Sequence, residues 1–174
     1  MIRAEPPKVY LVTGPVQTGK TTRLRAWCDE RSDVDGILAP VVDGQRHLLH
    51  IGSGVMRNLE DVSDGAATVT VRRYTFNADV FAWARSCLFS AAEPIPERDA
   101  RPHWIIVDEV GPLELRGGGL EPAVSELLSR VMEDPPRIAD NPPGVVLVIR
   151  EHLVDDALKH FGVSPAHTDP FPFV

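Results

Sequence analysis

Nine residues near the start of the chain have the spacing of a phosphate-binding loop. Residues 14–22 match G-x-x-x-x-G-K-[ST] and add a second threonine. Gly14 and Gly19 allow a tight turn with inward-pointing N–H groups, so the loop and the following helix N-terminus can cradle phosphate oxygens. The predicted nucleotide-binding residues are Gly14, Pro15, Val16, Gln17, Thr18, Gly19, Lys20, Thr21 and Thr22.

Two side chains of this loop have expected roles in chemistry. Lys20 is expected to reach the β- and γ-phosphates as a mobile positive charge, and the Thr21 hydroxyl is expected to ligate Mg²⁺. The alternative is an ordinary glycine-rich turn that caps a helix. The motif and its context favour a site for a nucleoside polyphosphate.

A second stretch ends in two acidic residues. Residues 104–107 are apolar, and Asp108 and Glu109 follow them directly. This pattern is typical of a buried parallel strand whose carboxyl end delivers acids to a ligand crevice. Asp108 is predicted to associate with Mg²⁺, and Glu109 to orient the attacking water as the catalytic base. Many strands end in acidic loops, so the pair gains its weight from the phosphate loop upstream.

Hydrophobic periodicity predicts the elements that position these two stretches. Short apolar runs predict buried strands at 9–12, 104–107 and 144–149. Apolar residues at helical spacing predict a helix at 21–31, a helix at 78–91 with Asn77 as its N-cap, and two later helices. The later helices are marked by Val124, Leu127, Leu128 and Val131, and by Leu153, Val154, Ala157, Leu158 and Phe161. Alternating strands and helices indicate an α/β fold with a largely parallel sheet.

An antiparallel insert is expected between the first two helices. Residues 36–42 and 45–51 are apolar runs separated by Asp43-Gly44, which is typical of a β-hairpin. A further strand is predicted at 68–71. The β-hairpin insert thus covers about 37–72 within a single predicted domain of residues 1–174.

Several residues remain open at this level. Arg150 follows a strand and is either a γ-phosphate sensor or a salt-bridging arginine, and Arg116 is a second candidate sensor. Glu114 is a reserve candidate for the base. The glycine run at 117–119 is interpreted as a flexible link, and the tail at 163–174 is expected to dock on the domain or on a partner.

Composition narrows the classes of partner. The chain has 174 residues, of which 43% are hydrophobic, and its 18 basic and 25 acidic residues give a net charge of −7. Without a cluster of Lys or Arg, nucleic acid is an unlikely partner. Neither a signal sequence nor a run of membrane-spanning length is recognised, so no membrane association is expected and the expected compartment is the cytoplasm.

The loop, the start of the hairpin at 36–40 and residues 107–115 together resemble one family. This family is the small P-loop nucleoside-triphosphatases related to the human cancer-related nucleoside-triphosphatase. The resemblance covers nearly the whole chain and implies a three-layer, RecA-like P-loop NTPase domain with a mostly parallel central sheet and helices on both faces. It also implies Mg²⁺ as cofactor, with roles for Lys20, Thr21, Asp108 and Glu109. The sequence departs from the family pattern at Gln17, where such loops often have glycine.

The leading interpretation is therefore an NTPase that hydrolyses ATP, GTP and other nucleoside triphosphates to diphosphates by attack of water on the γ-phosphate. One alternative is a small-molecule or nucleotide kinase, because the same cradle and metal serve phosphoryl transfer to an alcohol. The other is an NTP-dependent switch with slow turnover. Base preference and any protein partner are not predicted by the sequence.

Overall fold

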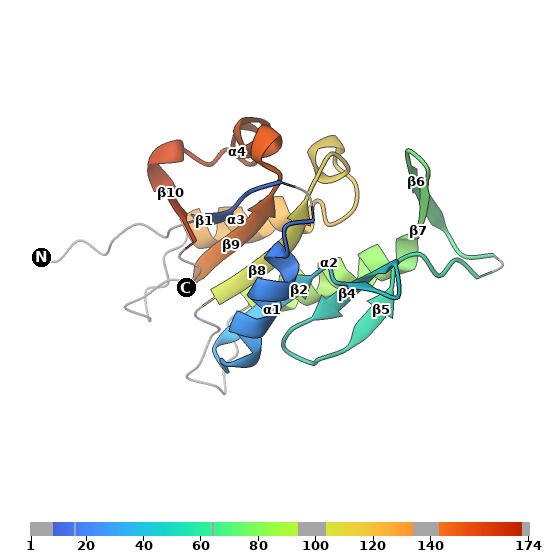
Figure 1. Ribbon diagram of the computed structural model, residues 1–174. Coiled ribbons are helices and arrows are strands. Elements are labelled where there is room, and N and C mark those ends of the chain that lie inside the picture. The colour runs from blue at the N-terminus through green and yellow to red at the C-terminus, as the bar shows by residue number, and fades with distance from the viewer. Residues whose placement is uncertain (1–8, 16, 64, 94–103, 134–142, 172–174) are drawn as a thin grey trace, which may run out of the picture.

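The computed structural model describes residues 9–15, 17–63, 65–93, 104–133 and 143–171. Its centre is an eight-stranded sheet in the order β10-β1-β9-β8-β2-β4-β3, with β5 paired to β4 (Figure 1). The strands are β1 (Val9–Val12), β2 (Val34–Leu38), β3 (Val41–Val42), β4 (Gln45–His50), β5 (Met56–Asn58), β8 (Trp104–Val110), β9 (Gly144–Ile149) and β10 (Thr168–Pro170). The five strands from β10 to β2 are mutually parallel, whereas β4 runs antiparallel to its neighbours.

Helices cover both faces of this sheet. The α-helices are α1 (Lys20–Asp29), α2 (Ala78–Ala92), α3 (Ala123–Glu133) and α4 (Val154–Phe161). Successive side chains of a strand point to opposite faces, and β8 follows this rule: Ile105 and Val107 pack in the core shared with α2, α3 and α4, while Ile106 packs in the core shared with α1. The three-layer α/β fold predicted from the sequence is confirmed.

The second helix begins where the sequence predicts. The Asn77 carboxamide oxygen accepts hydrogen bonds from the backbone N–H groups of Asp79 and Val80, which satisfies two donors of the first helical turn. The predicted apolar stripe of α2 is buried. Its members are Phe81, Ala84, Leu88 and Ala91.

The predicted insert consists of two antiparallel units. β4 pairs with both β2 and β3, so the first arm of the hairpin is one strand interrupted at Ala39 and Pro40, and Asp43-Gly44 forms the turn. This arm belongs to the central sheet. The second unit is the separate hairpin of β6 (Thr68–Val71) and β7 (Tyr74–Asn77), which projects from the start of α2 (Figure 1). The sequence predicted the first of these two strands but not the second.

The described part of the tail docks on the domain. Residues of β10 pair in parallel with β1, and the Phe171 N–H donates to the Leu11 carbonyl at 2.9 Å. The Phe171 ring meets those of Tyr10, Trp27 and Trp104 edge to face, with centroids 5.1–6.1 Å apart. The tail therefore completes the core on the α1 face.

The parallel strands end at one edge of the sheet. β1 leads into the glycine loop, β2 into Ala39, β8 ends at Asp108, Glu109 and Val110, and β9 ends before Arg150. Because parallel strands present their carboxyl ends to the same crevice, residues far apart in the sequence meet there.

Candidate nucleotide-binding and catalytic site

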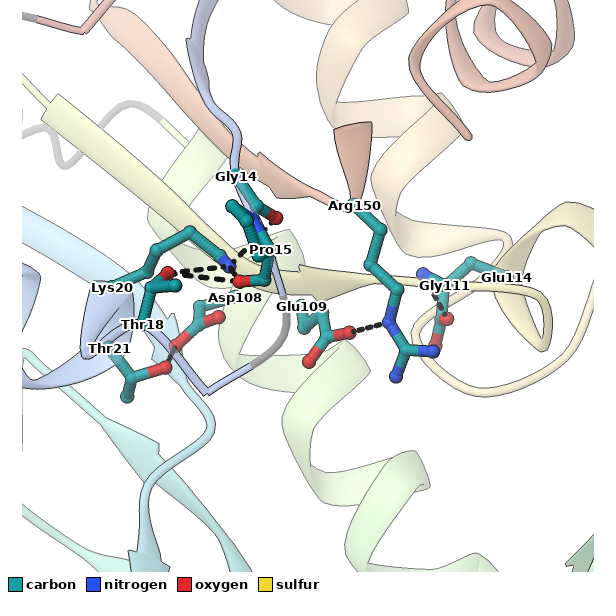
Figure 2. A network of polar contacts seen from close by, with 10 residues as sticks. All are labelled: Gly14, Pro15, Thr18, Lys20, Thr21, Asp108, Glu109, Gly111, Glu114 and Arg150. Carbon is teal, nitrogen blue, oxygen red and sulfur yellow. Dashed lines mark hydrogen bonds and ion pairs between the residues drawn. The ribbon is translucent and has the colours of Figure 1, made fainter. Parts of the chain in front are cut away.

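The phosphate-loop motif lies between β1 and α1, as the sequence predicts. Gly14 has φ 142° and Gly19 has φ 77°, conformations that glycine adopts without a steric penalty. The Lys20 ammonium donates to the carbonyls of Gly14, at 3.1 Å, and Pro15, and it lies 3.4 Å from the Thr18 hydroxyl (Figure 2). The positively charged Lys20 side chain therefore folds back onto the loop that precedes it.

The other loop residues frame this arrangement. Gln17, where the family pattern often has glycine, has φ 61°, so a residue with a Cβ stands in the left-handed region. That conformation costs such a residue about 1 kcal/mol or more. Gln17, Thr18 and Thr22 are exposed, and Val16 lies outside the described residues.

Asp108 and Thr21 meet at the end of β8. The Thr21 hydroxyl donates to Asp108 Oδ2 at 2.8 Å, and the Ala39 N–H donates to the same oxygen at 3.1 Å (Figure 2). Asp108 is only 1% exposed. Burial raises the pKa of this carboxyl to about 6, although the hydrogen bonds from Ala39 and Thr21 act in the opposite direction.

Thr21 and Asp108 suit a hard divalent cation. A hydroxyl and a carboxylate are oxygen ligands of the kind that Mg²⁺ prefers, and Mg²⁺ in phosphate sites usually takes few protein ligands beside substrate oxygens and water. The two residues come from different elements and already lie in contact. Their chemistry therefore fits the cation implied by the family.

Glu109 points to the other side of the strand end and forms an ion pair. Its Oε1 accepts a hydrogen bond from Arg150 Nε at 2.8 Å (Figure 2). Glu109 is exposed and Arg150 is partly exposed. Arg150 also lines an open cleft of about 340 Å³ together with Gly14, Pro15, Glu151 and His152. The glycine loop and Arg150 thus border one cleft.

Glu114 has a structural environment that the sequence did not indicate. It lies in the 3₁₀ turn η1 (Glu114–Arg116), and its carboxylate accepts from the N–H groups of Gly111, at 3.0 Å, and Leu120, at 3.2 Å. Burial raises its pKa to about 7, opposed by these backbone hydrogen bonds. Glu114 is therefore a buried support of the loop after β8, which does not suit the role of reserve base.

The glycine run is ordered around Glu114, and the interpretation as a flexible link is wrong. A Cβ on Gly119 would overlap Glu114 Oε1, and Gly119 has φ 60°. The Arg85 guanidinium of α2 donates to the Gly119 carbonyl at 2.7 Å, which ties the loop to the helix. Arg116, the second candidate sensor, is exposed.

Sequence reasoning missed Ala39 and Arg85 because each makes a long-range contact that involves a backbone group, and such contacts leave no signal in the sequence. Ala39 contributes only its backbone N–H, and Arg85 reaches a backbone carbonyl of a distant loop. Glu114 did carry a signal. An acidic residue between apolar residues and close to several glycines is a candidate for a buried carboxylate that accepts backbone N–H groups.

Comparisons with known proteins concern the fold and the family of the chain. The chain is similar over 95% of its length to a structure described as THEP1 from the hyperthermophile Aquifex aeolicus, with 90% of that chain covered, 19% sequence identity and a TM-score of 0.63. At this identity the likeness concerns the fold. A search of curated proteins gave no significant match. The sequence model of a family described as NTPase matches residues 9–139, most of the chain, and the protein therefore belongs to that NTPase family.

Proposed function

We propose that this protein is a Mg²⁺-dependent nucleoside-triphosphatase that converts ATP, GTP and other nucleoside triphosphates to diphosphates and phosphate. The observation that carries the proposal is the contact between Thr21 and Asp108, 2.8 Å apart although they belong to different motifs. A phosphate loop joined in this way to a strand-end acid is the arrangement that P-loop enzymes use to hold a metal–phosphate complex. Family membership supports the same reaction class.

Each residue has a distinct part in the proposed reaction. Loop N–H groups and Lys20 would bind the phosphates, and Thr21 and Asp108 would hold Mg²⁺. The bound cation would neutralise part of the phosphate charge. Glu109 orients a water and accepts its proton as the water oxygen bonds to the γ-phosphorus. The bond from that phosphorus to the β,γ-bridging oxygen breaks, so the diphosphate leaves with the electron pair.

Product analysis with γ-labelled ATP tests this proposal. Labelled phosphate should appear in the absence of any acceptor and should require Mg²⁺. γ-Labelled GTP should also release labelled phosphate. Label that moves only onto an added alcohol or nucleotide would favour a kinase. Turnover that appears only with a partner protein would favour a switch.

We propose the cytoplasm as the compartment, and nucleoside triphosphates rather than nucleic acid as the partners. Both cysteines, Cys28 and Cys87, are free, as expected where thiols stay reduced. Burial raises the pKa of Cys28 to about 12, so this thiol is unreactive. Within the described part of the chain, no helix combines the length and apolar character needed to cross a bilayer.

A further inference from the structure

The proposed base is engaged by an arginine that lines the cleft beside the glycine loop. Glu109 and Arg150 leave adjacent parallel strands at their carboxyl ends, where Val110 of β8 pairs with Ile149 of β9. The 2.8 Å contact from Arg150 Nε occupies one carboxylate oxygen of Glu109. While this ion pair holds, Oε1 of Glu109 is engaged with Arg150 and is not available to a water.

Arg150 is placed to exchange this partner for another anion. It borders the cleft together with Gly14 and Pro15, whose carbonyls contact the Lys20 ammonium. Within the described part of the chain, Glu109 is the hydrogen-bond partner of the guanidinium, through Nε alone. A terminal phosphate offers more charge and more acceptor oxygens than a carboxylate, and the planar guanidinium binds both kinds of group in bidentate fashion.

We propose that Arg150 is a positioning residue that couples binding of the terminal phosphate to release of Glu109. A nucleoside triphosphate draws the guanidinium from Glu109 to the γ-phosphate, and the freed carboxylate then orients the attacking water. A diphosphate lacks this group and leaves the ion pair in place. The inference rests on the proposed hydrolysis and assigns Arg150 the discrimination between substrate and product.

This coupling makes Glu109 a competitor of the triphosphate for Arg150. Removing the carboxylate in Glu109→Ala should therefore tighten binding of a non-hydrolysable ATP analogue several-fold. Loss of a nearby negative charge would also favour an anion without any exchange of partners. The two explanations differ in whether the gain depends on Arg150.

A double-mutant cycle separates them. Binding of the ATP analogue and of ADP, both with Mg²⁺, is measured by calorimetry for wild type, Glu109→Ala, Arg150→Ala and the double variant. Arg150→Ala should weaken binding of the analogue by about 10-fold or more, as expected for a lost hydrogen bond to a charged group, and should change ADP affinity less than twofold. The gain from Glu109→Ala should vanish in the Arg150→Ala background.

Three further variants serve as controls. Arg130→Ala breaks two exposed ion pairs, one to Glu126 of α3 and one to Glu93, and should leave both affinities unchanged. Arg150→Gln keeps most of the side-chain stem and replaces Arg150→Ala as the background if the latter unfolds. Arg150→Lys keeps the charge and should restore part of the preference for the triphosphate.

The outcomes are distinct. The coupling is wrong if Glu109→Ala gives no gain, if the gain persists without Arg150, or if Arg150→Ala weakens both nucleotides equally. If the wild-type protein hydrolyses ATP but the effects of Glu109→Ala and Arg150→Ala on binding are independent, this inference alone is overturned. Wild type that neither binds nor hydrolyses triphosphates would overturn the proposed function.

Discussion

At the scale of residues, Lys20 carries the ammonium group of the phosphate-loop motif. It contacts the carbonyls of Gly14 and Pro15, and a triphosphate offers it far stronger acceptors. Lys20→Ala should therefore weaken ATP affinity and abolish turnover. Equilibrium titration and phosphate release measure the two effects, with exposed Lys159→Ala as the control. Wild-type affinity in Lys20→Ala would contradict the assignment of the loop.

Asp108 allows metal binding to be separated from folding. Its Oδ2 accepts both local hydrogen bonds, from Thr21 and Ala39, and an amide oxygen can take its place in Asp108→Asn. The variant should keep the wild-type circular dichroism spectrum but require much more Mg²⁺ for activity, because the negative charge is gone. An unchanged Mg²⁺ titration would place the metal elsewhere.

Residues whose spacing is fixed by their own motif can be located from the sequence alone. Gly14 to Thr22 and the Asp108-Glu109 pair are recognisable because each motif is continuous along the chain. From the sequence, Arg150 remains open between a γ-phosphate sensor and a salt-bridging arginine, and its pairing with Glu109 is not predicted. Only the spatial adjacency of β8 and β9 shows that the two side chains meet.

At the scale of elements, the loop after β8 is organised by one buried carboxyl. Glu114 bonds the N–H groups of Gly111 and Leu120, and Gly119 packs against it without room for a Cβ. This loop follows Glu109 directly, so its order helps to fix the strand end that carries the proposed base. Backbone N–H donors leave no periodic pattern in a sequence, so the available signal for this role was the acidic residue itself, set between apolar residues and close to several glycines.

The pKa of Glu114 predicts how stability changes with pH. Its pKa is about 7 in the folded protein and about 4.5 when unperturbed, so the folded state binds more protons between these values. The stabilisation is present below about pH 4.5 and is lost as pH rises through 7, by at most about 3 kcal/mol. Burial also raises the pKa of Asp108, so this carboxyl contributes to the pH dependence of stability with the same sign.

Urea unfolding at several pH values isolates the contribution of Glu114. The free energy of unfolding of Glu114→Gln should fall less steeply between pH 5 and 7 than that of wild type. Its absolute stability should be lower at acidic pH, because the amide group faces a backbone N–H. Identical pH slopes in the two proteins would show that Glu114 does not titrate in this range.

At the scale of the whole molecule, the chain end closes one face of the sheet. Phe171 is 7% exposed among Tyr10, Trp27 and Trp104. No periodicity predicts β10, whose Thr168–Pro170 segment is short and contains proline, so the sequence suggested docking without its place. β10 pairs with β1, a strand near the other end of the described chain, and such a long-range contact is visible only in the structure.

Phe171→Ala should lower the free energy of unfolding by about 3 kcal/mol, because it leaves a cavity in this core. The melting temperature should fall by roughly 10 °C. Tryptophan fluorescence follows the transition locally and circular dichroism follows it globally. Val41→Ala, at a side chain 65% exposed, should change little.

The same experiment tests the assignment of residues 1–174 to one domain, which stays a prediction. A single domain should lose both signals in one coincident transition. Two separate transitions would show that the insert or the tail unfolds independently. An unchanged melting temperature in Phe171→Ala would contradict the packing of the tail against β1 and α1.

Hydrolysis by water activated at Glu109 is tested most directly by Glu109→Gln in single-turnover experiments, with ATP binding measured on the same protein. The substitution keeps the size and hydrogen-bonding capacity of the side chain but removes the base, so an interaction needed for attack is lost while nucleotide binding remains. We predict that the rate falls by about 10² to 10⁴, as is typical of lost general-base assistance, with binding equal to that of wild type or tighter. A wild-type rate in Glu109→Gln would contradict the mechanism.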